Sequence, residues 1–375
     1  MEKSNVYENV QDRYSQGAQQ RQEALCCPVD YDQSLLTALP QEIIDKDYGC
    51  GDPSRYVREG DHVLDLGSGG GKICYMAAQL VGDQGHVTGV DMTDEMLTLS
   101  RKYKPEMAAA LGSDRVTFHK GYIQDLALDV GATEQYLAEQ PIKNAADLQA
   151  LLRWQSEQRC NEPLIRDNSI SLVISNCVLN LVAETDRKQM ISEIYRVLAP
   201  GGRVAISDIV ADERVPGELK DDPELWSGCI SGAFQEADFL NAFVDAGFVA
   251  VAYDKWDSAP WQVVDGIEFR SVTLTAMKPV GDDDYDGGHA LLYKGPYVQV
   301  KDDGGNVYYR GERMAVSKHT YDAQLGGAYN DDFIGFEPAQ PLNNGPFRSP
   351  EGTRRAASVT KGGIHNASTQ KNSCC

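Results

Sequence analysis

The sequence contains no apolar run of about 18 residues, the length that a membrane-spanning helix requires. Residues 1–20 are polar and carry charges of both signs, so they lack the apolar stretch of a secretory signal. These absences argue against a membrane span and against export. We therefore expect a cytoplasmic protein with no membrane partner.

Basic residues are scarce relative to acidic ones. Lysine and arginine together number 35 and aspartate and glutamate 56, a formal net charge of −21. A surface with this excess of carboxylates repels phosphate backbones and anionic lipids. The composition therefore argues against nucleic acid as a partner and leaves small molecules and soft cations open. We also expect a monomer.

Apolar, strand-like runs alternate with helical patterns through most of the chain. This alternation predicts an α/β fold with a doubly wound, mostly parallel, seven-stranded sheet. The expected strands are 62–66, 87–90, 115–119, 170–175, 203–209, 249–253 and 270–277. The expected helices are 34–44, 72–81, 93–102, 145–157, 187–198 and 237–246.

Changes in composition divide the chain into four parts. We predict a polar, partly helical leader at 1–45, an α/β domain at 46–280 and a small β-rich domain at 285–338. Residues 339–375 are rich in Gly, Asn, Ser and Arg, which predicts a disordered tail. Within the α/β domain, 126–169 is too long for a loop and indicates an insertion.

A glycine-rich turn follows the first predicted strand and leads directly into a helix. Its residues are Gly67, Ser68, Gly69, Gly70 and Gly71. Glycine lets the backbone turn tightly and approach a ligand, and the N-terminus of the helix offers free N–H groups to an anionic group. This turn alone fits a dinucleotide-binding site equally well.

Two acidic residues narrow the choice of ligand. Asp91 closes the second strand, 24 residues beyond Gly67, where a carboxylate can accept hydrogen bonds from both ribose hydroxyls. Asp65 stands just before the glycines, and this D-x-G-x-G pattern resembles the class I methyltransferases, which use S-adenosylmethionine. In that superfamily the region after the third strand, here with Ile123 and Gln124, contacts the adenine.

Nine cysteines are present, and they fit either buried apolar thiols or a soft-metal or redox site. Cys50 and Cys229 lie between or beside glycines, in exposed, flexible settings that suit ligation. Cys177 follows the fourth strand, where amino-group methyltransferases carry an Asn/Asp-Pro-Pro-aromatic motif that this chain lacks. We expect these three thiolates to converge near the cofactor. Zinc would need a fourth ligand, and no C-x-x-C motif or histidine pair supplies one, whereas trivalent arsenic takes three thiolates.

Six segments together resemble the arsenite S-adenosylmethionine methyltransferase family. They are 48–51, 64–75, 85–93, 175–181, 195–198 and 228–233. The resemblance implies that Cys50, Cys177 and Cys229 bind arsenic and that 46–280 is the methyltransferase domain. It also implies a redox disulfide between Cys50 and a leader cysteine, either Cys26 or Cys27. The cofactor contacts that it implies are Tyr48, Gly67, Asp91, Met92, Ile123 and Asn176.

The expected reaction is transfer of methyl groups from S-adenosylmethionine to thiol-bound trivalent arsenic, giving mono- and dimethylated arsenicals in detoxification. Arsenite would arrive as a thiol adduct, and glutathione or thioredoxin would be the reductant. Many family members have Glu before the third arsenic cysteine, and Gly228 stands here instead, which puts acid assistance from that position in doubt. Two alternatives remain open: a small-molecule C- or O-methyltransferase, and a non-enzymatic thiol protein that binds arsenic or metal.

Overall fold

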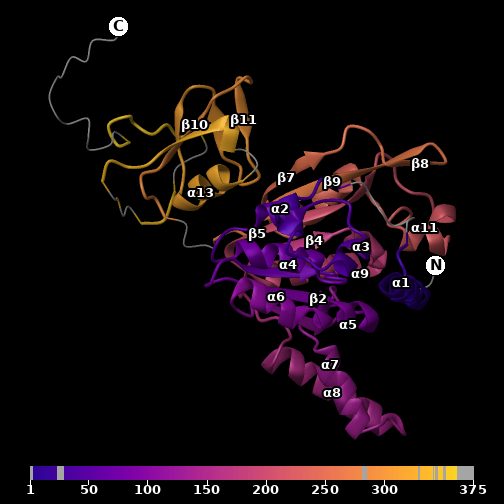
Figure 1. The fold of residues 1–375 in the computed structure, drawn as a ribbon. Coiled ribbons are helices and arrows are strands. Elements are labelled where there is room, and N and C mark those ends of the chain that lie inside the picture. The colour runs from indigo at the N-terminus through magenta and orange to yellow at the C-terminus, as the bar shows by residue number, and fades with distance from the viewer. Residues whose placement is uncertain are drawn as a thin grey trace. The chain divides into compact units, whose positions relative to one another are not determined.

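The computed structural model describes residues 3–22, 29–280, 285–327, 330–340, 342, 345–348 and 352–360. The chain divides into two compact units, Met1–Phe248 with Tyr253–Lys278, and Val249–Ala252 with Pro279–Cys375 (Figure 1). Among the helices of the described residues, none combines the length and the apolar character that a membrane crossing requires.

The first unit is built on one large sheet with the strand order β3-β2-β1-β4-β5-β9-β7. The strands from β3 to β5 are parallel, and β9 pairs with β5 in the antiparallel direction. The short strands β6 and β8 pair with β5 and β9. The bounds are β1 (His62–Leu66), β2 (His86–Asp91), β3 (Val116–Lys120), β4 (Ile170–Asn176), β5 (Leu198–Ala211), β6 (Phe234–Gln235), β7 (Val249–Trp256), β8 (Gln262–Val264) and β9 (Ile267–Met277). This sheet confirms the predicted fold class, and its main path has the seven predicted strands.

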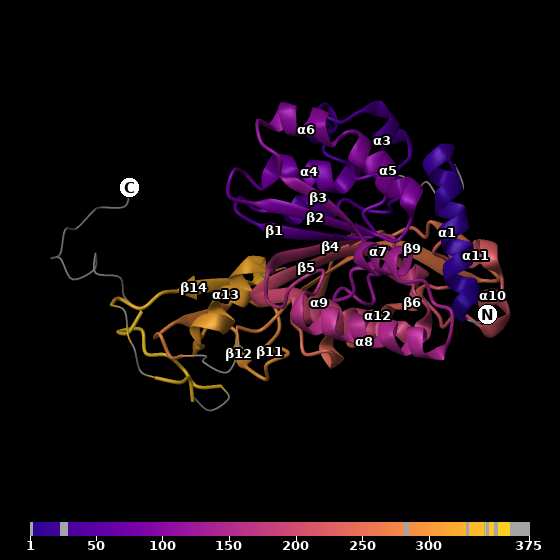
Figure 2. The same ribbon diagram turned by 90° about the horizontal axis from the view of Figure 1, so that it is seen from below.

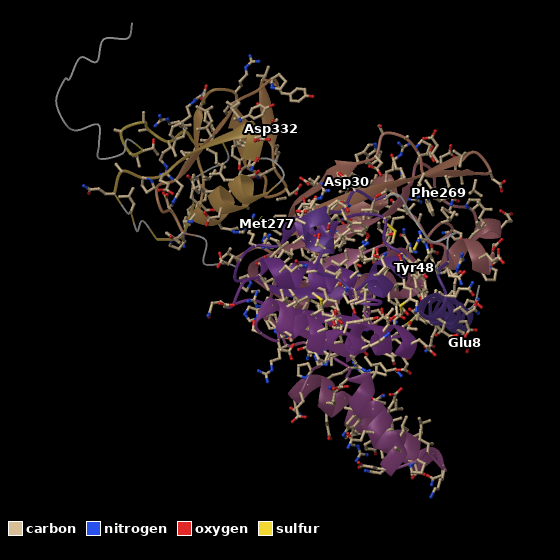
Figure 3. The ribbon with its side chains drawn as sticks, in the orientation of Figure 1. Glu8, Asp30, Tyr48, Phe269, Met277 and Asp332 are labelled. Carbon is tan, nitrogen blue, oxygen red and sulfur yellow. A yellow bond between two sulfur atoms is a disulfide. The ribbon has the colours of Figure 1, made fainter. Side chains whose placement is uncertain are left out.

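Helices cover both faces of this sheet (Figure 2). One face carries α4 (Lys72–Leu80), α5 (Asp94–Lys102) and α6 (Lys104–Leu111), and the other carries α9 (Glu184–Val197) and α12 (Glu236–Asp245). Consecutive residues of the central strands are therefore buried, as at Val63 and Leu64, which are both fully enclosed. The side chains of the two layers fill the space between helices and sheet (Figure 3). The carboxyl ends of the parallel strands meet at one edge, and the candidate site lies there.

The described part of the leader adds three helices to this unit: α1 (Lys3–Gln19), α2 (Gln33–Leu36) and α3 (Gln41–Asp45). The prediction of one helix over 34–44 was wrong, because Pro40 lacks an amide hydrogen and caps the start of α3 instead of continuing α2. A 3-10 turn, Pro53–Tyr56, then leads into β1. The side chains of Val6 and Val10 on α1 are buried, and α1 packs beside α5 and α11 (Pro223–Ser227).

The insertion between β3 and β4 forms two helices, α7 (Val130–Glu139) and α8 (Ala145–Asn161). They are held together by stacking of Tyr136 on Trp154, whose ring centroids lie 4.8 Å apart. Asn144 caps α8 in a reciprocal arrangement with Asp147. Two more short elements, a 3-10 turn at Leu179–Leu181 and α10 (Gly217–Lys220), lie in the loops after β4 and β5.

The second unit contains a three-stranded antiparallel sheet in the order β13-β10-β14 and a hairpin of β11 and β12. Its described residues also form a helix, α13, and a 3-10 turn, Asn330–Asp332. The bounds are β10 (Ala290–Tyr293), β11 (Gln299–Lys301), β12 (Val307–Tyr309), β13 (Arg313–Ala315), α13 (Lys318–Gly326) and β14 (Phe333–Phe336). Its core is a cluster of buried side chains from these strands, among them Leu291, Tyr308 and Met314. The unit thus has an apolar core of its own.

Candidate functional site

The glycine turn adopts a backbone that other residues rarely accept. Gly67, Gly69 and Gly71 all have positive φ, at 69°, 50° and 89°. A Cβ on Gly67 would lie 2.5 Å from Val178 Cγ1, so a larger residue would collide with the loop after β4. The nearest atom to a Cβ built on Gly69 would be the sulfur of Met96, 4.0 Å away. The turn therefore leaves open space at the start of α4, where helix geometry gives the first backbone N–H groups no partner within the helix.

Two buried carboxylates stand beside this turn. Asp91 accepts hydrogen bonds from the backbone N–H groups of Gly69 and Thr93, both at 2.8 Å. Burial raises the pKa of Asp91, and these backbone donors act in the opposite direction. Asp65 accepts a hydrogen bond from the Cys74 thiol at 3.2 Å. Burial raises the pKa of Asp65 to about 7, against the lowering effect of that thiol.

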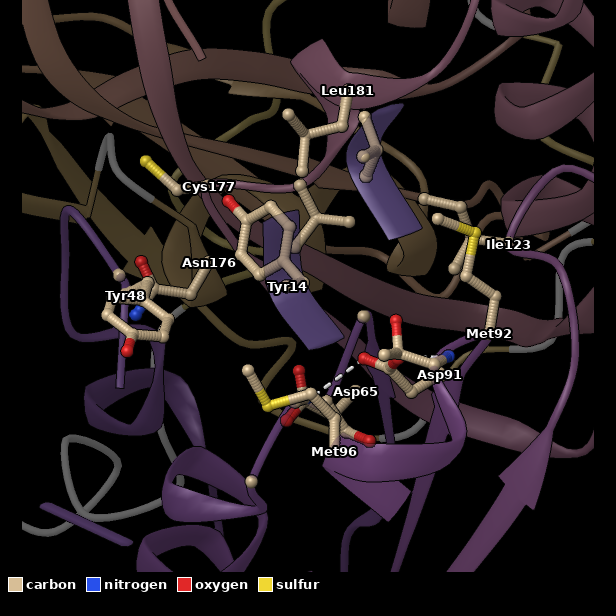
Figure 4. Close-up of a pocket in the computed structure, with 18 of the residues that line it drawn as sticks. Tyr14, Tyr48, Asp65, Asp91, Met92, Met96, Ile123, Asn176, Cys177 and Leu181 are labelled. Carbon is tan, nitrogen blue, oxygen red and sulfur yellow. Dashed lines mark hydrogen bonds between the residues drawn. The ribbon is translucent and has the colours of Figure 1, made fainter. Parts of the chain in front are cut away.

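These groups border one cavity at the carboxyl edge of the sheet (Figure 4). Ten of the eleven predicted cofactor residues line it: Tyr48, Asp65, Gly67, Ser68, Gly69, Asp91, Met92, Ile123, Gln124 and Asn176. Gly71 lies behind the wall, where it caps α4 and packs against Phe118. The local motifs and the expected adenine region thus meet around one space.

The side chain of Asn176 holds the turn that carries Cys50. Its Oδ1 accepts hydrogen bonds from Cys50 N at 2.9 Å and Gly51 N at 3.0 Å, and its Nδ2 donates to Gly51 O at 2.8 Å. A Cβ on Gly49 would lie only 1.9 Å from Asn176 Nδ2, so the close fit depends on glycine there. Ser271 adds a hydrogen bond of 2.7 Å from its hydroxyl to Cys50 O. Asn176, at the end of β4, therefore fixes Cys50 against the neighbouring Cys177.

The three predicted arsenic ligands lie together, although not as three free thiols. Cys50 and Cys177 form a disulfide with their Cα atoms 5.8 Å apart. The Cys229 thiol donates a hydrogen bond to Cys177 O at 3.1 Å. All three cysteines are buried, and Cys177 forms part of the cavity wall. The structure thus brings the three positions together, and it shows two of the three in an oxidised state.

Cys177 and Cys229 also share an unusual backbone conformation. Their φ angles are 60° and 62°, in the left-handed region that disfavours residues with a Cβ. Such a conformation costs on the order of 1 kcal/mol and tends to occur at functional sites. The Cys177 backbone is held there by a hydrogen bond from its N–H to Ser207 O at 2.8 Å. The fold therefore maintains an unfavourable backbone at both positions.

A buried carboxylate, Asp208, lies against the disulfide. One of its oxygens and the sulfurs of Cys50 and Cys177 are all within 4.8 Å of one another. Asp208 accepts hydrogen bonds from Leu179 N at 2.9 Å, Ile209 N at 2.8 Å and the Asn180 side chain at 2.7 Å. Burial raises the pKa of Asp208 to about 7, and the backbone donors oppose this. Its bonds fix the turn after Cys177 and place negative potential beside the sulfurs.

The sequence prediction missed the contribution of α1 to the cavity. Tyr7, Val10 and Tyr14 line it, and Arg13 anchors the helix through hydrogen bonds of 2.7 Å to Glu224 O and Ser227 Oγ. Burial, and then the neighbouring Cys229 with which it shares a hydrogen bond, raise the pKa of the Tyr14 hydroxyl well above its usual range. Figure 4 shows this hydroxyl on the side of the cavity where Cys177 lies. The spacing of the three side chains is helical, which was the one signal that could have revealed this face.

Of the remaining cysteines, the structure describes Cys74 and Cys160. The predicted redox partners Cys26 and Cys27, and the terminal Cys374 and Cys375, are outside the described residues. The expected pairing of Cys50 with Cys26 or Cys27 therefore stays a prediction, and the structure has Cys50 bonded to Cys177 instead. Cys74 is buried beside Asp65, and Cys160 is exposed on α8.

Comparison with known proteins identifies two family matches. Residues 58–247 match a family described as a methyltransferase domain, and residues 281–365 match a domain of unknown function (DUF8838). The chain is similar to the arsenite methyltransferase of Aquipseudomonas alcaligenes, with 32% identity over 307 residues that cover 77% of this chain and 78% of that protein. It is also similar to the arsenite methyltransferase of Mus musculus, with 28% identity over 319 residues, or 81% and 74% of the two chains.

A solved structure extends the similarity to three dimensions. The crystal structure of CrArsM, an arsenic(III) S-adenosylmethionine methyltransferase from Chlamydomonas reinhardtii, is 28% identical to this chain. It superposes with a TM-score of 0.56 and covers 86% of this chain and 100% of that one. The similarity therefore extends well beyond the glycine turn and its flanking strands.

Proposed function

Since the chain belongs to the arsenite methyltransferase family, we propose that Cys50, Cys177 and Cys229 hold the trivalent arsenic beside the cavity. The protein is an S-adenosylmethionine-dependent methyltransferase with arsenite as its substrate, which confirms the predicted methylation of arsenic. The family assignment argues against the two alternatives, a carbon or oxygen acceptor and a non-enzymatic thiol protein. One observation carries the proposal for the ligands: Cys177, in the cavity wall, is bonded to Cys50 and accepts a hydrogen bond from Cys229.

The polar groups around the cavity support S-adenosylmethionine as its ligand. Gly69 leaves room for close backbone approach, and the start of α4 offers N–H groups to the methionine carboxylate. Asp91, at the carboxyl end of β2, would accept hydrogen bonds from the two ribose hydroxyls. When bound, this cofactor supplies an electrophilic methyl group on a positively charged sulfur. We propose that it is held by the ten predicted residues that line the cavity: Tyr48, Asp65, Gly67, Ser68, Gly69, Asp91, Met92, Ile123, Gln124 and Asn176.

Arsenic binding requires the Cys50–Cys177 bond to be reduced first. A thiol reductant such as glutathione or thioredoxin supplies two electrons and two protons, becomes oxidised itself and leaves both side chains as thiols. Arsenite, arriving as a tris-thiol adduct, then exchanges its three thiols for those of Cys50, Cys177 and Cys229. Three protein As–S bonds form, three bonds to the carrier thiols break, and the carrier thiols leave protonated. Soft thiolates favour a soft ion such as arsenic(III).

The residues around the three sulfurs orient and protect this complex. Cys177 is in the cavity wall, which directs the arsenic lone pair toward the methyl group. Tyr7, Val10 and Tyr14 of α1 cover the site and exclude water. Electrostatic interactions between the charged and polar groups of the site are therefore not weakened by solvent. Tyr14 keeps its proton and can donate it in a hydrogen bond to the Cys229 sulfur.

Methylation raises arsenic formally to the pentavalent state, and two protein thiols can return it to the trivalent state. They lose two electrons and form a disulfide, which the reductant then opens. Two pairings are candidates: Cys50 with Cys26 or Cys27, as the resemblance implies, and the Cys50–Cys177 bond of this structure. Repeating the cycle gives mono- and then dimethylated arsenic.

This account predicts that turnover depends strictly on a thiol. Purified protein incubated with arsenite and S-adenosylmethionine should form methylated arsenic at least about 10-fold faster when dithiothreitol is present, because the disulfide occupies two of the three ligands. Arsenic speciation by liquid chromatography with mass detection measures this. If the protein methylated another acceptor but not arsenic, the result would contradict the proposed function. Equal rates of arsenic methylation with and without dithiothreitol would contradict the redox step.

Replacing Asn176 by alanine should impair the arsenic site while leaving the rest of the fold intact. Two buried backbone donors, Cys50 N and Gly51 N, would lose their acceptor, at a cost of about 1–3 kcal/mol each. Since Cys50 would no longer be held against Cys177, we expect the rate to fall by about 10-fold or more. The rate and the thermal unfolding midpoint are compared with those of Asn161→Ala, an exposed position at the end of α8. An unchanged rate in the Asn176 variant would refute this positioning role.

We further propose that the protein acts as a monomer in the cytoplasm, where it serves arsenic detoxification. The reducing thiol pool of that compartment would keep Cys50 and Cys177 available for arsenic. Sedimentation velocity of the reduced protein tests the oligomeric state, and a dimer with or without arsenite would contradict it.

A further inference from the structure

The C-terminal unit contains a second cavity that the methylation reaction does not use. Its volume is about 300 Å³, and all of its lining residues belong to this unit. It opens between β10, the β11–β12 hairpin and the start of β14. The region matches a family whose function is unknown, so its chemistry must be read from the side chains.

Aromatic rings form much of the cavity wall. Tyr293, Tyr308 and Phe333 are buried, at 3%, 1% and 7% exposure, and their positions are fixed by ring contacts. The Phe333 centroid lies 5.7 Å from that of Tyr293 and 4.9 Å from that of Tyr308. Tyr297 is 69% exposed and adds a fourth ring at the mouth. A packed aromatic wall with one exposed ring suits a ligand with an apolar surface.

Carboxylates give this aromatic cavity a negative charge. Among the described residues that line it, Asp302, Asp303 and Asp332 outnumber the basic residue Lys301, so acidic groups are in excess. Asp332 lies on the turn before β14 (Figure 3). Phosphates and other anions are disfavoured by this charge. An organic cation is favoured twice, by the carboxylates and by the negative faces of the rings.

The hydrogen bonds of the carboxylates narrow the choice of cation. Asp302 already accepts bonds from Asn306 N at 2.8 Å, Tyr308 Oη at 2.6 Å and Gln324 Nε2 at 3.3 Å. Asp303 accepts one from Val251 N at 3.3 Å, which is part of the same unit. Because the lone pairs of Asp302 are engaged, this carboxylate offers charge more than new hydrogen bonds. A cation without N–H donors loses least in such a site, whereas a hard metal ion would need free carboxylate oxygens.

From these features we infer that the cavity binds a methylated onium cation, such as a quaternary ammonium group. The rings of Tyr293, Tyr297, Tyr308 and Phe333 contact the methyl groups, and the carboxylates neutralise the charge. This binding needs no cysteine and no methyl donor, so it is independent of the arsenic chemistry.

Calorimetric titration of the full-length protein with choline tests the inference, with 3,3-dimethylbutanol as the uncharged ligand of the same shape. The methyl-donor cavity is first saturated with S-adenosylhomocysteine, so that choline cannot bind there. We expect saturable choline binding and at least about 10-fold weaker binding of the alcohol, since the alcohol has no charge to interact with the rings. Absence of saturable binding, or equal affinity for both ligands, would overturn the proposal.

Two variants then locate the site. Tyr297→Ala removes the exposed ring and should weaken choline binding about 5-fold or more, and Asp332→Asn should weaken it by a smaller factor. Both positions are exposed, so folding should be preserved. Val298→Ala, the adjacent exposed apolar position, is the matched control and should bind as the unmodified protein does. Choline affinity that is the same in Tyr297→Ala and Val298→Ala would exclude this cavity.

Discussion

Replacing Cys177 by serine should lower the rate of arsenic methylation by about 100-fold or more, because the site loses the sulfur that lies in the cavity wall. A serine oxygen is a hard ligand and binds arsenic(III) poorly. Arsenic that remains on Cys50 and Cys229 would also no longer be aimed at the methyl group. Initial rates of monomethylarsenic formation at saturating S-adenosylmethionine measure the loss.

Two controls separate this effect from general damage. Cys160→Ser changes an exposed thiol on α8 and should leave the rate unchanged. The affinity of Cys177→Ser for S-adenosylmethionine should stay within a small factor of the original, since Asp91 and the glycine turn are intact. A Cys177→Ser enzyme that methylates arsenic at close to the original rate would reject Cys177 as a ligand.

Replacing Asp91 by asparagine should weaken S-adenosylmethionine binding by about 100-fold. The carboxylate accepts bonds from Gly69 N and Thr93 N, and it offers its remaining lone pairs to two ribose hydroxyls. The amide of asparagine has one oxygen where the carboxylate has two. Its NH₂ group would therefore face a hydrogen-bond donor from which it cannot accept a bond. Each lost bond to a charged acceptor is worth about 1.5–3 kcal/mol. Calorimetric titration gives the affinity directly.

The matched control is Glu95→Gln, an equivalent change of charge at an exposed position in the first turn of α5. It should bind the cofactor as tightly as the unmodified protein does. Since Asp91 also supports the glycine turn, the unfolding midpoints of both variants are measured alongside. The loss of two hydrogen bonds to a charged acceptor should weaken binding far more than threefold. A cofactor affinity of Asp91→Asn within threefold of the original would therefore contradict the ribose contact.

The sequence predicted those parts of the site whose residues are close together in the chain. The strand, glycine turn and helix from His62 to Leu80 form one local unit, and Asp91 follows on the next strand, so hydrophobic periodicity and glycine chemistry were sufficient to identify them. Gly71 belongs to the same predicted turn, but the space beside its Cα is occupied by the ring of Phe118. Motif membership alone did not reveal which glycine faces the ligand.

Contacts between distant segments were harder to predict. The disulfide joins residues 127 positions apart. Tyr14, near the start of the chain, shares a hydrogen bond with Cys229, which follows β5. No local pattern encodes such contacts, because the folding of the whole sheet creates them. The cysteines were recognised only from their glycine-rich surroundings and from the family resemblance, and α1 looked like a polar leader because only one face of it is apolar.

The small β-rich domain was predicted in outline. The strands at Ala290–Tyr293 and Val307–Tyr309 are short runs of apolar and aromatic residues, which is the pattern that predicts a β-rich domain. β13 and β14 were missed, because Arg313–Ala315 is very short and Gly335 interrupts the pattern of β14. The helix α13 was missed for a related reason, as its apolar positions lack a clear helical period.

The central claim is that sulfur atoms from three distant segments bind one arsenic atom, and arsenic K-edge X-ray absorption of the reduced, arsenite-loaded protein tests it most directly. We predict three sulfur neighbours around arsenic in the unmodified protein, one each from Cys50, Cys177 and Cys229, and the loss of one of them in Cys229→Ser. An arsenic atom with mainly oxygen neighbours, or three sulfurs retained in Cys229→Ser, would contradict the account.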